Sequence, residues 1–436
     1  MNEAFDAVVV GAGPAGSAAA LKLAQAGLKV VLLERGEFPG AKNVFGGVLY
    51  RKQIEDLVPE FWKEKNAPIE RSIVEQRMWM MGKESYTTFS HRNEAFKEPM
   101  NCFTGLRVKF DQWLAGKAVE AGAIPVYETT AVELLRHGDR VVGVRTDRDD
   151  GDLYANVVVI ADGVNSLLGK SLGVHRGWKP DQVSLVVKEM IALPKEKIED
   201  RFNVEGDEGV TVEFMGETSL GMAGMGFLYT NKESISLGIG VMVNDLTQRG
   251  IKPYELLDSV KQHPVIRKLI QGGERKEYAA HLIPEGGFRS IPALSGNGWC
   301  LAGDAAQLVN FVHREGTNLA MKSGELAATA IIEATNQGDF SAQSLGRYDE
   351  AMRASFIMKD LKKYKGMHQL MKDYDSTLLF DKIPQAINQA AFQMFSVDGV
   401  AKEEKQKQAI RLVKEAAGGT LNLVKLGIKG WRATNG

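Results

Sequence analysis

The pattern of apolar positions predicts a strand–helix–strand unit at the start of the chain. Ala7–Val10 is an unbroken apolar run, typical of a strand that is buried on both faces. A helix is predicted over Pro14–Gln25, and Gly27 suits the left-handed residue that ends it. Lys29–Leu33 supplies a second buried strand. A unit of this kind favours a parallel α/β sheet.

Two later runs return to the same kind of short strand. Asn156–Ile160 is β-branched and leads to Asp162-Gly163, and 298–302 leads to Gly303-Asp304 and then to a long helix that starts within 315–324. Asp304 can bind a polyol chain through charge-assisted hydrogen bonds, while the N-terminus of the long helix faces an electron-rich ring. A single Asp-Gly is usually a turn. Three strand ends of this kind, about 150 residues apart, imply one large ligand held by distant parts of the chain.

The middle of the chain alternates apolar with small or polar residues, as strands of a half-covered antiparallel sheet do. Such strands are predicted over Val183–Ile191, Gly209–Phe214, Gly224–Thr230 and Ser234–Val243. After about residue 349 the pattern becomes helical. Helices are predicted over Arg353–Met371, Pro384–Phe395, Lys402–Ala417 and Leu421–Trp431.

Charge divides the chain unevenly. From Met352 onward there are 15 Lys and Arg against 8 Asp and Glu, so this part carries +7 while the first 351 residues carry −8. Solvated helix faces explain such a balance, and contact with anionic lipid or an acidic partner protein explains it equally. The segment 375–395 is apolar with few charges, which adds to the case for contact.

Composition narrows the class of protein. With 44% hydrophobic and 25% charged residues, the chain is typical of a soluble globular protein, and no run of ~18 apolar residues predicts a membrane span. Glu3 and Asp6 stand where a signal peptide needs positive charge, so a cytoplasmic location is expected. Two cysteines, Cys102 and Cys300, exclude a disulfide framework and a four-thiolate iron–sulfur cluster built from this chain alone. The seven histidines lack metal-ligand spacing, so no metal site is predicted.

The glycine spacing in the first turn predicts a dinucleotide site. Gly11 suits the tight turn, Gly13 lets the backbone approach a pyrophosphate, and Gly16 lets the helix pack closely on the strand. The pyrophosphate would lie on amides at the helix N-terminus. Glu34, 18 residues beyond Gly16, can accept hydrogen bonds from ribose hydroxyls and would repel an adenosine 2′-phosphate.

These motifs, and several unusual strings outside them, carry a resemblance that runs nearly end to end. The glycine turn with Glu34, together with 106–114, 161–166 and 302–306, resembles the FAD-binding pattern of the group that includes p-hydroxybenzoate hydroxylase and geranylgeranyl reductase. Within that group the chain is most similar to the family of FixC and electron-transfer-flavoprotein:quinone oxidoreductase, with FixC the nearer of the two. The strings similar to FixC are 39–50, 226–230, 282–287 and 394–398.

The resemblance implies the fold and its division. The fold would be α/β and α+β: a Rossmann-like FAD-binding domain of the glutathione-reductase type, as in p-hydroxybenzoate hydroxylase, with an inserted antiparallel β-sheet domain and a C-terminal helical region. The FAD-binding domain would comprise 1–72, 101–175 and 291–348, the substrate or quinone domain 73–100 and 176–290, and the helical region 349–436.

The resemblance also implies which residues hold FAD. Arg107, ahead of a helix predicted over Asp111–Val119, would contact the middle of the cofactor, unless it merely caps that helix. Val132, in a strand predicted over Val126–Leu134, would border the adenine, and Asp304 would bind the ribityl chain or phosphate. The full set of implied cofactor-binding residues is Gly11, Gly13, Pro14, Ala15, Gly16, Glu34, Arg35, Lys42, Asn43, Gly46, Gly47, Arg107, Val132, Asp162, Gly163, Gly303, Asp304, Gly316, Thr317 and Asn318.

Within that set, the residues from Lys42 to Gly47 would pass close to the isoalloxazine, and two adjacent glycines suit a backbone that touches a flat ring. Gly316 and Asn318 would lie against the pyrimidine end of the flavin. Phe227 and Tyr229 would line an apolar quinone pocket or are simply core aromatics, and His313 would stand beside the flavin or in an ordinary loop.

This chain is compared with the two kinds of relative at two features, its cysteines and the segment 305–315. The quinone oxidoreductases carry a cysteine-rich cluster domain in their own chain, whereas FixC takes its iron–sulfur centres from a small ferredoxin-like partner, so two cysteines favour the FixC arrangement. The segment 305–315 is shorter than in FixC and closer in spacing to the quinone oxidoreductase.

The implied function is electron transfer, with no catalytic dyad or triad. Electrons would pass from an electron-transfer flavoprotein, through a ferredoxin-like iron–sulfur protein and FAD, to a membrane quinone. The helical tail would attach the protein peripherally to the inner face of the cell membrane or dock the ferredoxin-like subunit, and no nucleic acid is expected. Alternatives are a flavin monooxygenase, a geranylgeranyl-reductase-like prenyl reductase, whose Tyr-x-Trp-x-Phe-Pro string is absent, and an FAD-bearing structural adaptor.

Overall fold

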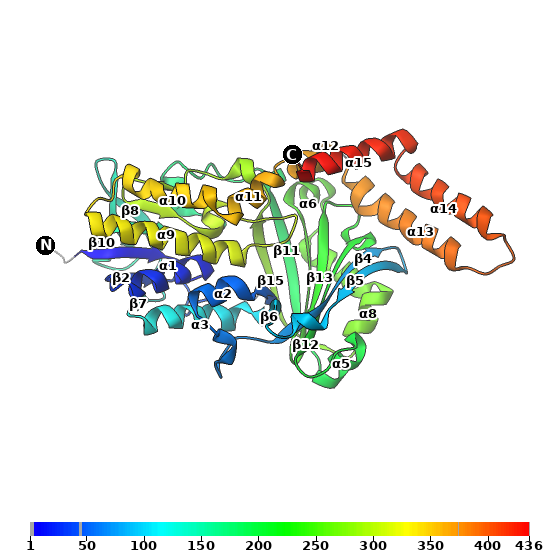
Figure 1. Ribbon diagram of the computed structural model, residues 1–436, viewed down its shortest axis with the longest axis horizontal. Coiled ribbons are helices and arrows are strands. Elements are labelled where there is room, and N and C mark those ends of the chain that lie inside the picture. The colour runs from blue at the N-terminus through cyan, green and yellow to red at the C-terminus, as the bar shows by residue number, and fades with distance from the viewer. Residues whose placement is uncertain (1–3, 43–45, 374, 436) are drawn as a thin grey trace.

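The computed structural model describes residues 4–42, 46–373 and 375–435 and contains two β-sheets with helices packed on them (Figure 1). The first sheet and its helices form one end of the molecule. The second sheet lies in the middle, and the last helices run past it to the other end.

The first sheet is built on the predicted strand–helix–strand unit. β1 runs parallel to β2 and to β10, and β10 runs parallel to β17, so these strands end at one edge. In spatial order its strands are β16 (Ser295–Gly296), β17 (Trp299–Leu301), β10 (Asp152–Ile160), β1 (Phe5–Val10), β2 (Val30–Leu33) and β7 (Ile124–Val126), and β8 (Ala131–His137) and β9 (Arg140–Thr146) extend β10 in antiparallel fashion.

Two helices cross closely beside this sheet. α1 (Pro14–Gln25) follows the glycine turn, and α9 (Thr317–Gln337) follows the loop after β17. A Cβ at Gly324 of α9 would lie 2.1 Å from the carbonyl oxygen of Ala15 in α1, so only glycine permits this approach. The crossing brings the N-termini of both helices to the same region.

The second sheet contains the predicted middle strands. It is mostly antiparallel, and the pair of β12 with β4 is parallel. In spatial order its strands are β15 (Glu274–Pro284), β11 (Val183–Ala192), β14 (Ser234–Met242), β13 (Gly224–Thr230), β12 (Glu208–Gly216), β4 (Arg71–Met81), β6 (Cys102–Leu106) and β3 (Gly46–Tyr50), and β5 (Tyr86–Arg92) pairs with β4. Because β3 and β6 belong to this sheet, sheet membership does not follow the predicted boundaries at residues 72 and 101.

The remaining helices cover the sheets and form the tail. In Figure 1, α13 and α14 lie side by side and project beyond the second sheet, while α12 and α15 lie above it. The helices are α2 (Arg51–Leu57), α3 (Arg107–Glu120), α4 (Leu167–Ser171), α5 (Lys195–Phe202), α6 (Val243–Arg249), α7 (Pro253–Gln262), α8 (Pro264–Ile270), α10 (Ala342–Ala354), α11 (Phe356–Lys363), α12 (Met367–Asp373), α13 (Ile383–Phe395), α14 (Lys402–Ala416) and α15 (Thr420–Asn435).

The structure confirms the helix predicted over Pro14–Gln25 and the strand over Gly224–Thr230. Two other predicted elements are wrong as single units. The helix over Arg353–Met371 is broken at Ser355, whose ψ of 164° is extended, and again between α11 and α12. The strand over Val126–Leu134 is divided into β7 and β8, because the amides of Glu128 and Thr129 turn to bond the backbone after β2.

Candidate cofactor site

The glycine turn after β1 is shaped by three different constraints. Gly11 has φ +101°, and a Cβ there would meet the carbonyl oxygen of Ala161 at 2.4 Å. A Cβ at Gly16 would lie 1.8 Å from the carbonyl oxygen of Gly11. Gly13 has an ordinary φ of −77°, and beyond its immediate neighbours no described atom lies within 4 Å of its would-be Cβ. The chain itself therefore does not demand a glycine at position 13, but a closely approaching ligand would.

Glu34, at the end of β2, turns back to the glycine turn. Its Oε2 accepts a hydrogen bond from the amide of Ala12 at 3.1 Å, and its Oε1 accepts one from the amide of Gly36 at 2.8 Å. Each carboxylate oxygen keeps a further lone pair for a hydroxyl donor. The predicted ribose acceptor is thus fixed in orientation beside the turn. Arg35, next along the chain, is exposed.

Asp162, at the end of β10, serves the fold with one oxygen and leaves the other open. Its Oδ2 accepts a hydrogen bond from the amide of Leu168 at 3.0 Å, in the first turn of α4. Its Oδ1 is buried and has no hydrogen-bond partner among the described residues, and burial raises the pKa of this carboxyl. Gly163 follows with φ +81° and open space beside it.

Gly303 and Asp304, after β17, lie against the head of α1. Gly303 has φ +65°, and its would-be Cβ is 2.9 Å from that of Ala15, so this strand end touches the first turn of α1. Burial raises the pKa of Asp304, and the nearby Arg107 opposes that rise. Arg107 was predicted to lie ahead of its helix, but it is the first residue of α3.

Arg107 is held by a bidentate ion pair. Its Nε and Nη2 donate to the two carboxylate oxygens of Asp111 at 2.7 and 2.8 Å, and the Asp111 side chain is only 2% exposed. The pair fixes the orientation of the guanidinium, whose charge acts on Asp304 and on Lys188 of β11. This role goes beyond capping a surface helix.

The N-terminus of α9 points its first residues toward the same region. Gly316 is the N-cap, Thr317 is the first helical residue, and Asn318 is buried. The Oδ1 of Asn318 and the Oε1 of Gln307, in the preceding loop, have no hydrogen-bond partner among the described residues. Buried amide oxygens without donors are unusual in a finished core and indicate a polar group that the chain does not supply.

Together these residues fit FAD. Three strand ends and two helix N-termini converge here. There is open space beside the would-be Cβ of Gly13, and side-chain oxygens of Asp162 and Asn318 have no hydrogen-bond partner among the described residues. Glu34 would hold the ribose, the head of α1 the diphosphate, and Asp304 the ribityl chain. We therefore call this region the cofactor cradle.

Four other predicted cofactor-binding residues lie outside the strand ends and helix N-termini of the cradle, and a fifth is not described. Lys42 is exposed, and Asn43 lies outside the described residues. Gly46 and Gly47 begin β3, where they pair with Leu106 and Gly105 of β6. Val132 lies on β8 with its side chain 53% exposed, so only its backbone is suited to border an adenine.

The predicted quinone residues lie where the loop before α9 meets the second sheet. The rings of Phe227 and Tyr229 stack with centroids 4.9 Å apart and an interplanar angle of 17°. Arg314, in the loop, forms an ion pair with Glu213 of β12, and both act electrostatically on Tyr229. His313 hydrogen bonds through Nε2 to the hydroxyl of Tyr364 at 2.7 Å, which ties the loop to the end of α11.

Sequence reasoning missed three ionisable residues, of which two lie in the second sheet and one directly follows β15. Lys188 of β11 is 4% exposed, and burial with the neighbouring charge of Arg107 lowers its pKa to about 6. Burial lowers the pKa of His281 on β15 to about 4, with Lys188 and two arginines adding to the shift. Burial raises the pKa of Glu285 to about 7. The only signal in the sequence was the charged pair Lys188-Glu189 inside a mostly apolar strand.

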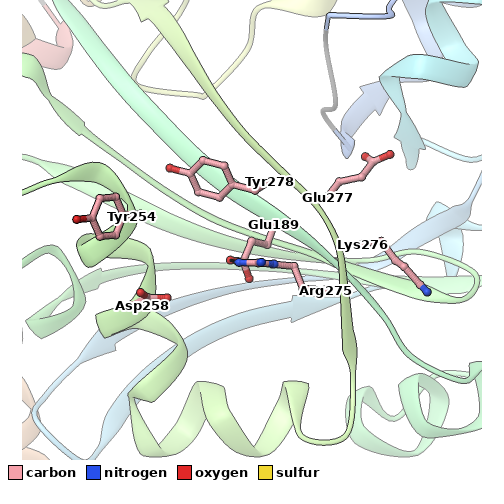
Figure 2. Close-up of a pocket in the computed structure, with 7 residues that line it drawn as sticks. All are labelled: Glu189, Tyr254, Asp258, Arg275, Lys276, Glu277 and Tyr278. Atoms are coloured by element: carbon pink, nitrogen blue, oxygen red, sulfur yellow. Dashed lines mark ion pairs between the residues drawn. The ribbon is translucent and has the colours of Figure 1, made fainter.

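A cavity of 500 Å³ lies beside α7, β11 and β15 and contains none of the predicted site residues. Figure 2 shows Tyr254 and Asp258 of α7 on one side of β15, near Glu189, while Glu277 points away from them. The lining residues are Glu189, Tyr254, Asp258, Arg275, Lys276, Glu277 and Tyr278. Their mixed charges and partial exposure differ from the buried cradle.

Both cysteines are buried, and possible metal ligands do not cluster within the described residues. Cys102 and Cys300 are buried and unpaired, and burial raises the pKa of both thiols. Within the described ranges, no three His, Cys, Asp or Glu side chains group as a metal ion requires. No helix in these ranges is both long and apolar enough to cross a membrane.

Comparison with known proteins assigns the family. Residues 6–163 match the FAD dependent oxidoreductase family, and residues 367–435 match the ETF-QO/FixC family C-terminal domain. The protein FixC of Bradyrhizobium diazoefficiens is 52% identical over 94% of this chain and 94% of its own length. The chain belongs to the FixC family.

The FixC family extends to proteins named for quinone reduction. The probable electron transfer flavoprotein-quinone oxidoreductase YdiS of Escherichia coli is 40% identical over 98% of this chain and 99% of its own. A geranylgeranyl bacteriochlorophyll reductase-like protein of Thermoplasma acidophilum shares the fold, with a TM-score of 0.72 and 22% identity over 95% of this chain and 98% of its own. The predicted family, fold class, FAD and oxidoreductase activity are confirmed.

Proposed function

We propose that this chain is the FAD-bearing subunit that carries electrons from an electron-transfer flavoprotein, through a ferredoxin-like iron–sulfur partner, to a membrane quinone. Membership of the FixC family supports the electron-transfer role. The observation that carries the proposal is the contact between the cradle and the second sheet. Arg314, two residues before the N-cap of α9, pairs with Glu213 beside the stacked Phe227 and Tyr229.

The residues of the chain position and insulate the cofactor. FAD, when bound, exchanges electrons singly or in pairs, which lets it join one-electron carriers to a quinone. Glu34 and the head of α1 orient its adenosine half, Asp304 and Asn318 its flavin half. Arg107, fixed by Asp111, supplies a permanent positive charge at the middle of the cofactor. The buried strands β1 and β10 form the core from which the cradle's strand ends emerge.

We infer that quinone approaches the flavin along Phe227 and Tyr229. Phe227 is half-buried and stacks on the buried Tyr229, and its ring supplies an apolar surface suited to a flat ring. Burial and the carboxylate of Glu213 raise the pKa of the Tyr229 phenol, so its hydroxyl stays protonated and able to donate a hydrogen bond. His313, tied to Tyr364, stands at the outer end of the same loop.

We infer that the tail binds the surface of an anionic membrane. Leu421, Val424, Ile428 and Trp431 follow one face of α15 at helical spacing and are 67%, 52%, 47% and 67% exposed. Phe395, at the end of α13, is 87% exposed. Basic residues flank this stripe at Lys425, Lys429 and Arg432. A stripe of this kind suits the boundary between lipid headgroups and acyl chains.

The test of the overall proposal is anaerobic reduction of the flavin in the native complex. Reduced electron-transfer flavoprotein should reduce the FAD, and added quinone should reoxidise it, with an iron–sulfur polypeptide co-purifying. Rapid reduction by NAD(P)H alone would indicate a monooxygenase instead. Loss of an isoprenoid double bond would indicate a prenyl reductase, and a flavin that stays oxidised with every partner present would indicate an adaptor.

The tail is tested by vesicle sedimentation. Trp431→Ser should reduce binding to anionic vesicles about fivefold, and neutral vesicles should bind the wild-type chain weakly. Tyr154→Ser, which removes a 41% exposed aromatic from β10, is the matched control. Equal sedimentation of both variants, with loss of the iron–sulfur subunit from Trp431→Ser, would assign the tail to a protein partner.

A further inference from the structure

The loop before α9 is a closed turn. Asn310 and Glu315 pair across it, and each backbone amide donates to the other residue's carbonyl oxygen, at 2.9 and 3.1 Å. The side-chain oxygen of Asn310 accepts a further hydrogen bond from the amide of His313 at 3.3 Å, and His313 is tied to Tyr364 at the end of α11. The turn leads directly into Gly316, the N-cap of α9, so it has a fixed place beside the cofactor cradle.

Arg314 projects from this turn onto the second sheet. Its φ of +57° is left-handed, a backbone conformation that costs free energy in a residue with a side chain. Its guanidinium forms an ion pair with Glu213 of β12, and its Nη1 lies 4.0 Å from the sulfur of Met225 on β13. The guanidinium therefore lies over the boundary between β12 and β13.

Phe227 lies at the same place on the sheet. In the register of the strands it is directly opposite Glu213 of β12 on one side and Gly238 of β14 on the other. Its ring lies across β14, because a Cβ at Gly238 would be 2.3 Å from the Cζ of Phe227. Alternation along β13 places Met225 and Tyr229 on the same face, and the Tyr229 ring stacks on that of Phe227. The ring thus leans away from β12, which leaves the β12 side to the guanidinium.

The guanidinium of Arg314 keeps hydrogen-bond donors for a ligand. It carries five N–H groups, of which the ion pair with Glu213 engages those on Nη2, and the sulfur near Nη1 is a weak acceptor. The Arg314 side chain is 37% exposed, whereas that of Glu213 is 16% exposed, so the buried carboxylate anchors a cation that reaches solvent. A fixed cation beside an aromatic ring suits a flat ligand with oxygen at its edge.

We propose that Arg314 donates a hydrogen bond to a carbonyl oxygen of the quinone while the quinone ring lies on Phe227. The proposal rests on the approach of quinone along Phe227 and Tyr229. A quinone becomes a quinol by taking two electrons from the flavin and two protons from solvent. Negative charge collects on the carbonyl oxygen as the electrons arrive, and a guanidinium that stays protonated throughout stabilises it. Glu213 acts through Arg314 and is a positioning residue.

Kinetics of the native complex test this, with reduced electron-transfer flavoprotein as donor and decylubiquinone as acceptor. Arg314→Met should raise KM for decylubiquinone about tenfold and lower kcat about tenfold, because the lost donor serves both the bound quinone and its charged state. Arg314→Lys keeps the charge without the planar fork and should recover part of both losses. The rate of FAD reduction in the absence of quinone, and the midpoint potential of the flavin, should stay at their wild-type values.

Two further variants separate quinone binding from the structural role of the ion pair. Arg314→Met/Glu213→Gln removes the carboxylate that the single variant leaves without its partner. It should regain the thermal stability that Arg314→Met loses but keep the kinetic losses with decylubiquinone. Arg92→Met is the matched control, because Arg92 is 33% exposed and pairs with the buried Glu208, also of β12. It should reduce quinone as the wild-type complex does.

Three results would overturn the proposal and leave the proposed function in place. Wild-type kcat and KM in Arg314→Met would mean that the arginine does not bind the quinone. Recovery of both constants in the double variant would mean that the ion pair serves the fold alone. A wild-type KM together with a shifted flavin potential would assign Arg314 to the flavin. A native complex whose FAD is reduced but is never reoxidised by decylubiquinone would overturn the proposed function itself, and with it the role of Arg314.

Discussion

The two sheets carry their candidate functional residues in different ways. In the first sheet these residues stand at the carboxyl ends of β1, β2, β10 and β17, where the chain leaves a parallel strand. In the second sheet Glu213, Tyr229 and Lys188 stand inside strands. A parallel sheet thus gathers its chemistry into short local motifs, whereas an antiparallel sheet distributes it over strands that meet only in the folded chain.

Breaking the buried ion pair between Arg107 and Asp111, at the start of α3 between the two sheets' candidate residues, should have the largest effect. Arg107→Met leaves the buried carboxylate of Asp111 without its partner, so we expect a loss of about 3 to 5 kcal/mol in the free energy of unfolding. Urea unfolding of the flavin-free chain measures it. The double variant Arg107→Met/Asp111→Asn should recover part of that loss, because no charge is left buried. A single variant as stable as the wild type would show that this ion pair within α3 does not stabilise the fold.

The second prediction separates ligand space from chain packing at the strand ends. Gly13→Ala should weaken FAD binding about 100-fold, or roughly 2.7 kcal/mol, while the flavin-free protein keeps its stability. The added methyl meets no other described side chain but enters the space expected for the diphosphate. Fluorescence titration with FAD and thermal unfolding measure the two quantities.

Gly346→Ala is the matched control for that prediction. Gly346 lies in α10 with no described atom within 4 Å of its would-be Cβ, so the change should stabilise the helix slightly and leave FAD affinity unchanged. A Gly13→Ala protein with wild-type affinity would place the diphosphate elsewhere.

The contrast between the sheets also explains what the sequence could predict. Gly11, Gly13, Gly16 and Glu34 could be proposed from the sequence because the motif expected to bind a dinucleotide is encoded within one short segment. Lys188 was not, because alternation tells which face a strand residue occupies but not which residues of another strand or domain meet it.

The break inside the strand predicted over Val126–Leu134 had a similar cause. β7 and β8 separate because the backbone after β2 attracts the amides of Glu128 and Thr129. That competition comes from residues about 90 positions away and has no local signal. Alternation of apolar and polar residues located strands of the second sheet, and the helical pattern located the tail. The parallel pairing of β12 with β4 could only be seen in the folded chain.

The third prediction tests the second sheet through pH. The unfolded chain holds the Lys188 proton up to about pH 10.5, whereas the folded flavin-free chain releases it near pH 6, so stability should rise with pH between these values. Glu285 and His281 titrate at or below about pH 7, which leaves the window from pH 7 to 9 to Lys188 among these three.

In that window, the wild-type chain should gain about 1.4 kcal/mol per pH unit relative to Lys188→Met. Chemical unfolding at pH 7, 8 and 9 measures the difference. If the free energies of unfolding of the two proteins changed with pH in parallel, Lys188 would be ionised in the folded chain. The second sheet would then not hold a neutral lysine.

The smallest expected effect is at the ribose end of the cradle. The carboxylate of Glu34 now accepts hydrogen bonds from two backbone amides. Glu34→Gln keeps the shape of the side chain but replaces one accepting oxygen with an NH2 group, which cannot accept from the amide that it faces. FAD binding should weaken about fivefold, or about 1 kcal/mol. Glu37→Gln, an exposed neighbour, should bind as the wild type does. A loss for Glu34→Gln as large as that for Gly13→Ala would mean that the acid supports the turn itself.

The close crossing of α1 and α9 has a consequence for biosynthesis. Ala15 leaves the ribosome about three hundred residues before Gly324, the residue of α9 that it contacts. Until then the first strand–helix–strand unit exposes the face that α9 will cover, and Asp304 is missing from its edge. The nascent chain therefore carries a partly built nucleotide fold until α9 has been made.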